Sequence, residues 1–108
     1  MSAHTKGPWA WSKNGASDEK TVCIDISPVL EGYEYRGAVA HLQSCEHIKG
    51  ITMAETEANA NLISAAPDLL KALQEAVAVI EAIKPPSYGM GTIVRGKSAI
   101  AKATGEPQ

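Results

Sequence analysis

The sequence predicts an α+β fold, a small antiparallel sheet of about three strands covered by a Pro-kinked long helical segment and a short C-terminal helix. Two patterns support it: the first half of the chain contains short alternating runs, and the second half contains apolar residues spaced three and four apart. With 108 residues, 44% of them hydrophobic, we expect a single domain over residues 1–108, with a β-rich part at 9–42 and a helical part at 52–104.

The strands are predicted from alternation and from turn residues. The first strand, WAWSK at 9–13, leads into Asn14 and Gly15, a dipeptide favoured in hairpin turns. The return strand is expected at 20–27 and a third strand, YEYRGAVAHL, at 33–42. The residues of the return strand that share one face are Val22, Ile24 and Ile26.

The helical half should begin at a capping box, since Thr52 is followed three residues later by Glu55. Pro67 lacks an N–H group and crowds the preceding turn, so we expect two helical pieces, with Pro67 at the first position of the second. One apolar stripe is expected to run along both pieces up to Lys84; it comprises Ala54, Ala58, Leu62, Ala66, Leu69, Leu70, Leu73, Ala76, Val77, Ile80 and Ile83.

The C-terminal segment is expected to form a loop and then a short helix. After Pro85 and Pro86, the glycines of SYGMG favour a flexible loop. The helix should run from about Thr92 to Ala103 and end at Gly105, which suits a left-handed cap.

Composition excludes several classes of protein. A net charge of −2 makes binding to a nucleic-acid backbone unlikely, since such binding depends on clustered cations. Charged residues interrupt the long helical segment, so we expect no membrane span. Two cysteines, Cys23 and Cys45, do not make a disulfide framework, and together these features favour a cytoplasmic protein with free thiols.

Three motifs resemble a widespread family of small phage and prophage accessory proteins of unassigned role. They are HTKGPW at 4–9, ETEANANLISAAPDLLKAL at 55–73 and AIAKATGE at 99–106, whereas 14–51 carries no pattern of the family. The resemblance implies a phage setting, and therefore the cytoplasm of an infected bacterium. We also expect the first motif to touch the ETEANA segment.

Histidines and cysteines offer one candidate centre for metal or catalysis. His41, Cys45 and His47, with Cys23 on a nearby strand, are ligand types that zinc prefers, but their spacing matches no standard zinc knuckle. Cys45 and His47 could also make a nucleophile and its base, if the fold brings them together. The alternative is that His41 is a strand residue at the edge of the core. We expect no metal, no cofactor and no enzymatic activity.

The best candidate for an anion site is the glycine-rich segment before the last helix. Glycines let backbone N–H groups approach an anion, a helix start adds partial positive charge, and two basic side chains follow. The residues expected to bind a small anionic or nucleotide ligand are Tyr88, Gly89, Gly91, Thr92, Arg95 and Lys97, together with Arg36, Trp9 and Asn59. The alternative for the glycines is a mobile connector. For Asn59 and Asn61 it is a pair of hydrogen bonds that tie the helix to the sheet or to HTKGPW.

Two hypotheses on function follow. The first is a phage-encoded, non-enzymatic counter-defence protein, a homo-oligomer that sequesters a nucleotide immune signal; small α+β phage proteins that act as such sponges have a similar size and composition. The second is a protein-interaction module that inhibits a host or defence protein through its helical or sheet surface. A phosphodiester-cleaving enzyme is a third, weaker alternative that needs the His41 cluster.

Overall fold

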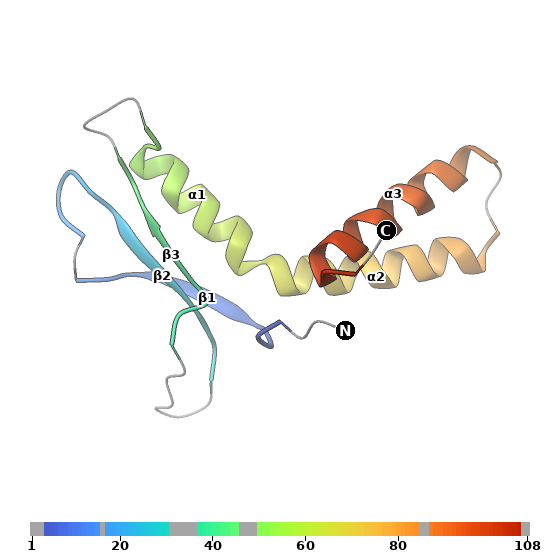
Figure 1. The fold of residues 1–108 in the computed structure, drawn as a ribbon, viewed down its shortest axis with the longest axis horizontal. Coiled ribbons are helices and arrows are strands. Elements are labelled where there is room, and N and C mark those ends of the chain that lie inside the picture. The colour runs from blue at the N-terminus through green and yellow to red at the C-terminus, as the bar shows by residue number, and fades with distance from the viewer. Residues whose placement is uncertain (1–3, 16, 31–36, 46–49, 85–86, 107–108) are drawn as a thin grey trace. The chain divides into compact units, whose positions relative to one another are not determined.

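The structure, a computed structural model, describes residues 4–15, 17–30, 37–45, 50–84 and 87–106. Its elements follow the order β1 (Trp9–Lys13), β2 (Cys23–Pro28), β3 (Ala40–Gln43), α1 (Met53–Ser64), α2 (Ala66–Ala82) and α3 (Ser87–Thr104), as drawn in Figure 1. The predicted α+β fold is confirmed. The chain divides into two compact units: Thr5–Pro67, called here the sheet unit, and Asp68–Gln108 with Met1–His4, whose helices form the helical hairpin. The expectation of a single domain stays a prediction.

The sheet is a three-stranded antiparallel meander with β2 in the centre. Asn14 N donates to Cys23 O at 2.9 Å and so closes the β1–β2 hairpin, as the Asn14-Gly15 pair predicted. β3 begins later than expected, at Ala40, because Gly37 has a φ of 106°, which a strand does not accommodate. The remainder of the expected third strand, 33–36, lies outside the described residues.

The core of the sheet unit lies between β2 and α1. Val22, Ile24 and Ile26 are buried, as their alternation predicted, and Ala60 of α1 completes the cluster. The face of α1 that packs on the sheet also includes Met53, Thr56 and Ile63. The stripe expected on this helix is therefore wrong: Ala54, Ala58 and Leu62 are exposed, Leu62 by 64%.

Two physical reasons explain why the expected stripe on α1 is exposed and another face is buried. The chain breaks between the helices at Ala65, so the helical phase of α2 does not continue back into α1. Thr56 can be buried despite its hydroxyl, because that hydroxyl donates to Thr52 O at 2.8 Å. Two helical pieces were predicted and are found, although Pro67 is the second residue of α2 and not its first.

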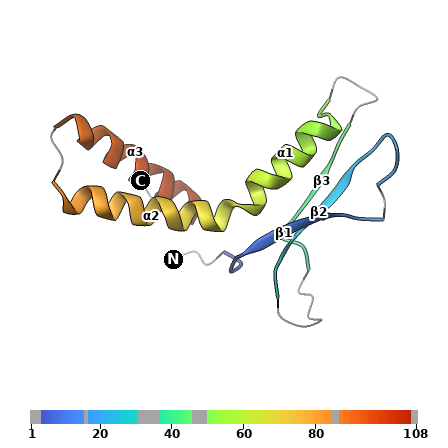
Figure 2. The ribbon, with the colours of Figure 1, turned by 180° about the vertical axis from the view of Figure 1, so that it is seen from behind.

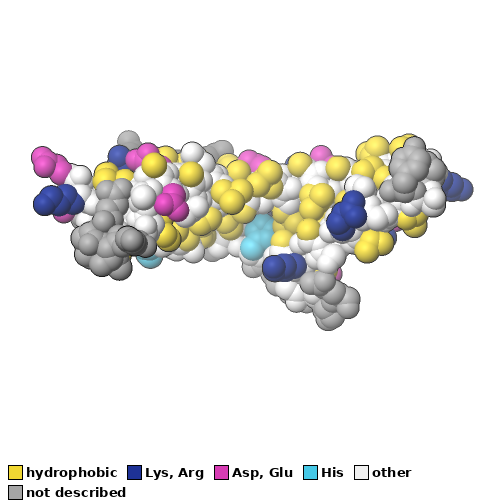
Figure 3. Space-filling view, turned by 90° about the horizontal axis from the view of Figure 1, so that it is seen from above, with side chains coloured by type: hydrophobic (Ala, Val, Ile, Leu, Met, Phe, Trp, Pro, Cys, Tyr) yellow, Lys and Arg dark blue, Asp and Glu magenta, His cyan; other side chains and the backbone are white. Residues whose placement is uncertain are grey.

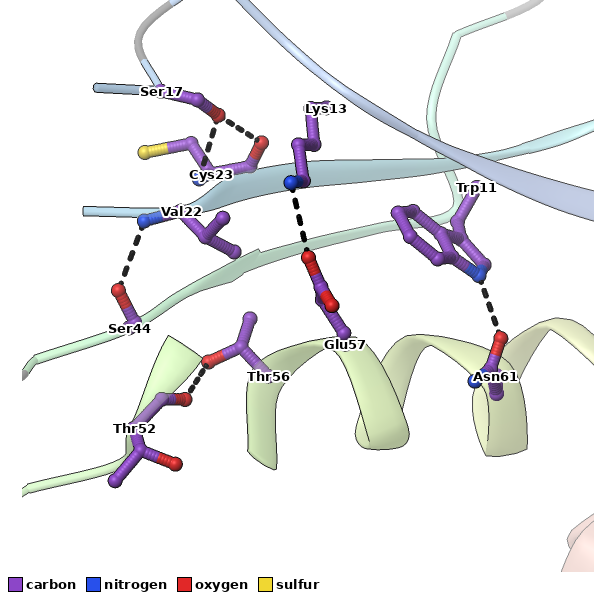
Figure 4. A network of polar contacts seen from close by, with 10 residues as sticks. All are labelled: Trp11, Lys13, Ser17, Val22, Cys23, Ser44, Thr52, Thr56, Glu57 and Asn61. Atoms are coloured by element: carbon purple, nitrogen blue, oxygen red, sulfur yellow. Dashed lines mark hydrogen bonds and ion pairs between the residues drawn. The ribbon is translucent and has the colours of Figure 1, made fainter. Parts of the chain in front are cut away.

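Polar contacts join α1 to the first strand (Figure 4). Trp11 Nε1 donates to Asn61 Oδ1 at 2.9 Å, and Lys13 Nζ lies 3.0 Å from Glu57 Oε1. The amide that ties the helix to the sheet is thus that of Asn61 and not of Asn59, which is exposed. The N-terminal motif lies close to Pro67 at Gly7, where an added Cβ would lie 2.7 Å from Cβ of Pro67. Pro67 lies beyond the ETEANA segment, so the expected contact with ETEANA stays a prediction.

The capping box at the start of α1 is confirmed. Glu55 N donates to Thr52 Oγ1 at 3.1 Å, while Thr52 N reaches Glu55 Oε1 at 3.4 Å. We expect Thr52→Ala to lower the free energy of unfolding by about 1 kcal/mol, because one N–H group at the helix start loses its acceptor. Urea titration followed by circular dichroism measures this change. Glu55→Gln is the matched control, since it keeps the Thr52 acceptor and should cost less.

The helical hairpin consists of α2 and α3, which lie side by side in both ribbon views (Figures 1 and 2). SYGMG is not the expected loop: α3 begins at Ser87 and is therefore longer at its start than the predicted helix. The predicted end is confirmed, since Gly105 has a φ of 74° and Glu106 N donates to Ala101 O at 2.9 Å. Gly105 N also donates to Lys102 O at 3.4 Å, and the two hydrogen bonds make a Schellman cap.

Candidate functional site

The two helices of the hairpin contact each other at a glycine. Val77 of α2 and Ile93 of α3 are buried, and a Cβ added to Gly96 would lie only 2.6 Å from Cγ2 of Val77. Leu73 and Ile80 of α2 are half-buried on the side of Val77, at the spacing expected of a helix seam. The core of the hairpin is therefore narrow.

The expected anion site is not assembled on this hairpin. Gly89, Gly91 and Thr92 lie in the first turns of α3, where only the first four N–H groups lack a partner within the helix. The described residues of this segment are helical and do not form the glycine-rich loop that was expected to surround an anion. Tyr88 also lies in this first turn.

The two basic residues of the expected site point apart. Arg95 and Lys97 are two positions apart on a helix, which separates their side chains by about 200°. Lys97 Nζ pairs with Glu81 Oε2 of α2 at 3.0 Å, while Arg95 Nη2 contacts Thr92 Oγ1 at 3.4 Å. Both cations are exposed, and they do not converge on one anion.

The remaining residues of the expected ligand site lie elsewhere in the chain. Trp9 and Asn59 belong to the sheet unit, where Trp9 Nε1 donates to Thr5 O at 3.1 Å and its ring packs against the core. Arg36 lies outside the described residues. Neither unit, as far as it is described, brings the expected set together.

A shallow hollow beside the sheet has a volume of about 70 Å³ and is lined by Thr5, Pro28, Gly37, Ala38 and Val39. Ligand pockets for molecules of nucleotide size typically measure roughly 300–1,000 Å³. This hollow can hold little more than a few water molecules, and none of the described residues that line it carries a cationic side chain.

The most unusual surfaces of the hairpin are apolar. On α2, a second stripe of apolar side chains is exposed beside the buried seam; Leu69 is 52%, Val79 61% and Ile83, just past the helix end, 69% exposed. On α3, Met90 is 51% and Val94 63% exposed. In the space-filling view, hydrophobic side chains reach the surface over the hairpin (Figure 3).

The sequence carried a signal for these surfaces that the expected single stripe missed. The buried seam of α2 follows the spacing of Leu70, Leu73, Val77 and Ile80, whereas Leu69, Ala72, Ala76, Val79 and Ile83 form a second set shifted by one residue. One set faces α3 and the other is exposed, because one residue corresponds to about 100° around a helix.

The sheet unit carries one polar cluster on its outer face. His41 Nδ1 contacts Asp25 Oδ1, which also accepts from Asn14 Nδ2 at 3.2 Å. Ser12 pairs in register with Asp25, so the carboxylate, and not the histidine, stands next to the hydroxyl-bearing residue. This order does not suit a serine nucleophile, which needs the histidine as its base.

The candidate metal centre is not assembled among the described residues. No group of three metal-binding side chains is found there, and His41 pairs with Asp25 and not with a cysteine. His47 lies outside the described residues, and Cys23 and Cys45 are free thiols.

The Asp25–His41 contact predicts a dependence of stability on pH. The hydrogen bond from His41, with that from Asn14, lowers the pKa of Asp25 below its ordinary value. The folded protein therefore keeps this carboxylate ionised at a pH where the unfolded chain takes up a proton. The contribution to stability is present above the unfolded pKa, about 4, and is lost as the pH falls through the lower folded value.

We expect Asp25→Asn to flatten the decline of the free energy of unfolding on acidification below about pH 4. The measurement is urea denaturation at a series of pH values. Asp18→Asn is the control, because Asp18 lies in the loop between β1 and β2 and accepts hydrogen bonds from Lys20 N and Thr21 N, with no histidine among these partners. An identical pH profile for wild type and Asp25→Asn would contradict the prediction.

The model of one protein family, Salmonella phage P22 protein Y8K6, matches residues 1–107. The chain belongs to this phage protein family. No curated protein and no solved structure matches the chain. Membership in the Y8K6 family confirms the expected resemblance to small phage proteins.

For this member of the Y8K6 family, none of the helices within the described ranges is long and apolar enough to span a bilayer.

Proposed function

We propose that this phage protein is a non-enzymatic interaction module that inhibits a host or defence protein through the outer face of α3. The observation that carries the proposal is the exposure of Met90 and Val94, one turn apart on that face. Large apolar side chains at this spacing are the anchors with which a helix enters a groove on another protein.

The charge of α3 specifies the chemistry of the partner. The helix contains Arg95, Lys97 and Lys102 and no acidic residue. Lys97 lies beside Met90 and Val94 on the helix surface and remains 58% exposed while paired with Glu81. The partner that fits this face has an apolar groove with carboxylates along its rim, because such a rim attracts the cations and rejects competing surfaces.

The test is a plating assay in bacteria that carry individual defence systems. We expect the wild-type chain to restore plating of a sensitive phage against one system, and Val94→Glu to abolish this restoration by placing a charge in the groove. Ala99→Glu is the matched control, since Ala99 is exposed on another side of the same helix. Equal activity of the two variants, or failure of the wild type against every system, would overturn the proposal.

Sequestration of a small anionic or nucleotide ligand is the weaker candidate. It is favoured by Arg95, whose guanidinium is exposed and contacts only the hydroxyl of Thr92 among the interactions described for it. Against it stand the divergence of Arg95 and Lys97 and the small volume of the hollow beside the sheet.

Thermal unfolding separates the two candidates. If the chain is an interaction module, a panel of linear, cyclic and ADP-ribose-type nucleotides leaves the unfolding midpoint unchanged. A ligand that binds only the folded state at about 100 times its Kd would instead stabilise the protein by about 2.7 kcal/mol, a shift of several degrees. Such a shift, lost in Arg95→Ala, would replace the interaction module with sequestration.

A further inference from the structure

The exposed stripe of α2 has the spacing of a helix–helix seam. Leu69, Ala72, Ala76, Val79 and Ile83 follow each other at intervals of three, four, three and four residues. This is the a and d pattern with which one helix packs along another over several turns. The two alanines at its centre allow close approach, and the three larger residues are more than half exposed.

The hairpin needs a further layer over this stripe. Its own core contains few side chains: of the large hydrophobic residues described in α2 and α3, Val77 and Ile93 are buried, whereas Leu69, Val79, Met90 and Val94 are more than half exposed. Two helices with so narrow a core are marginal, and helical proteins of this size gain stability from a bundle.

The charges beside the stripe show which partner fits it. Asp68 and Glu75, seven residues apart, follow one rim of the stripe, and Lys71 lies further around the helix from the stripe than either of them. The other rim is formed by α3. Glu81 lies about 160° around α2 from the centre of the stripe, and Lys97 of α3 pairs with it. The Lys97 side of α3 therefore faces away from the stripe. The side of α3 opposite to Lys97 is the one that lies beside the stripe. That side carries Arg95 and, seven residues later, Lys102.

We infer that the stripe is the interface of a homodimer in which the α2 helices of two copies pack in parallel about a two-fold axis along the helices. A stripe with one acidic and one basic rim is complementary to itself, since this two-fold places the acidic rim of each copy on the basic rim of the other. An antiparallel pairing would place acid on acid. The dimer leaves Met90 and Val94 open, because they lie on the Lys97 side of α3.

The first test is the mass of the full chain in solution, measured by sedimentation equilibrium. We expect twice the chain mass of 11.4 kDa for the wild type. Ala76→Glu places a charge in the centre of the stripe and should raise the dimer dissociation constant roughly 100-fold or more. Ala78→Glu is the matched control, because Ala78 is exposed on the opposite side of the same helix, and it should sediment as the wild type does.

Two further variants test the direction of packing. Glu75→Lys should weaken the dimer, and adding Arg95→Glu should restore it if the two residues face each other across the two-fold. With Cys23 and Cys45 replaced by serine, Leu69→Cys should form a disulfide-linked dimer on oxidation, because a parallel pairing brings the same ends together.

Each remaining outcome overturns part of the inference. A monomeric wild type, or equal masses for Ala76→Glu and Ala78→Glu, would remove α2 as the interface. If Ala76→Glu dissociates the dimer but Leu69→Cys forms no disulfide-linked dimer, the parallel arrangement would be overturned. Circular dichroism of every variant shows that the helices remain formed.

Discussion

Gly96→Val is expected to lower the free energy of unfolding of the helical hairpin by about 3 kcal/mol. A Cβ at this position lies 2.6 Å from Cγ2 of Val77, and Val77 is only 5% exposed. The valine side chain of residue 77 has little rotamer freedom in a helix, so the helices themselves must separate. The gain in helix propensity on leaving glycine, below about 1 kcal/mol, offsets only a part of this cost.

Two variants isolate the cause. Gly91→Ala adds a Cβ to the same helix but meets only the flexible end of Arg95, at 3.2 Å, so it should leave stability unchanged or raise it. Val77→Ala introduced into Gly96→Ala removes the obstructing methyl group and should recover stability relative to Gly96→Ala alone. If Val77→Ala recovers no stability in the Gly96→Ala background, a steric clash between residues 96 and 77 is not the cause of the loss.

Ile24→Ala is expected to lower the free energy of unfolding of the sheet unit by about 3–4 kcal/mol. Ile24 is fully buried on β2, the central strand of the sheet, and belongs to the core cluster of four buried residues, so its truncation opens a cavity inside the core. Val29→Ala is the control, because Val29 is 54% exposed and its truncation opens no cavity.

The two substitutions should be distinguishable by spectroscopy. Both tryptophans, Trp9 and Trp11, belong to the sheet unit, so their fluorescence reports on that unit in urea titration. We expect Ile24→Ala to shift the fluorescence transition strongly and Gly96→Val to act mainly on the helical signal in circular dichroism. Coincident shifts of both signals in both variants would show that the units unfold together.

The order of the helices and strands could be predicted from local sequence patterns, because each pattern depends on only a few neighbouring residues. Alternation located Val22, Ile24 and Ile26, and the capping box located the start of α1. The boundaries that depend on wider context were wrong. Glycines at SYGMG favoured a loop by their own propensity, but the segment forms the start of α3, so local propensity did not decide its structure.

The candidate site was harder to predict, since it depends on which side of each helix is covered. Arg95 and Lys97 are close in sequence, and only the helical state of the whole segment shows that they diverge. The residues of the two apolar sets of α2 alternate along the sequence. The same residues therefore fit one broad stripe or two separate stripes. The contact between Gly96 and Val77 shows which set faces α3. Because this contact joins two different helices, a local sequence pattern does not predict it.

The meander order of the sheet has a consequence for the time course of folding. β1, β2 and β3 pair with their neighbours in sequence, and α1 follows directly. Such short-range pairings close small loops and form rapidly. During synthesis the residues from Thr5 to Pro67 leave the ribosome before the hairpin is complete, so we expect the sheet unit to fold first and the hairpin of α2 and α3 to form afterwards.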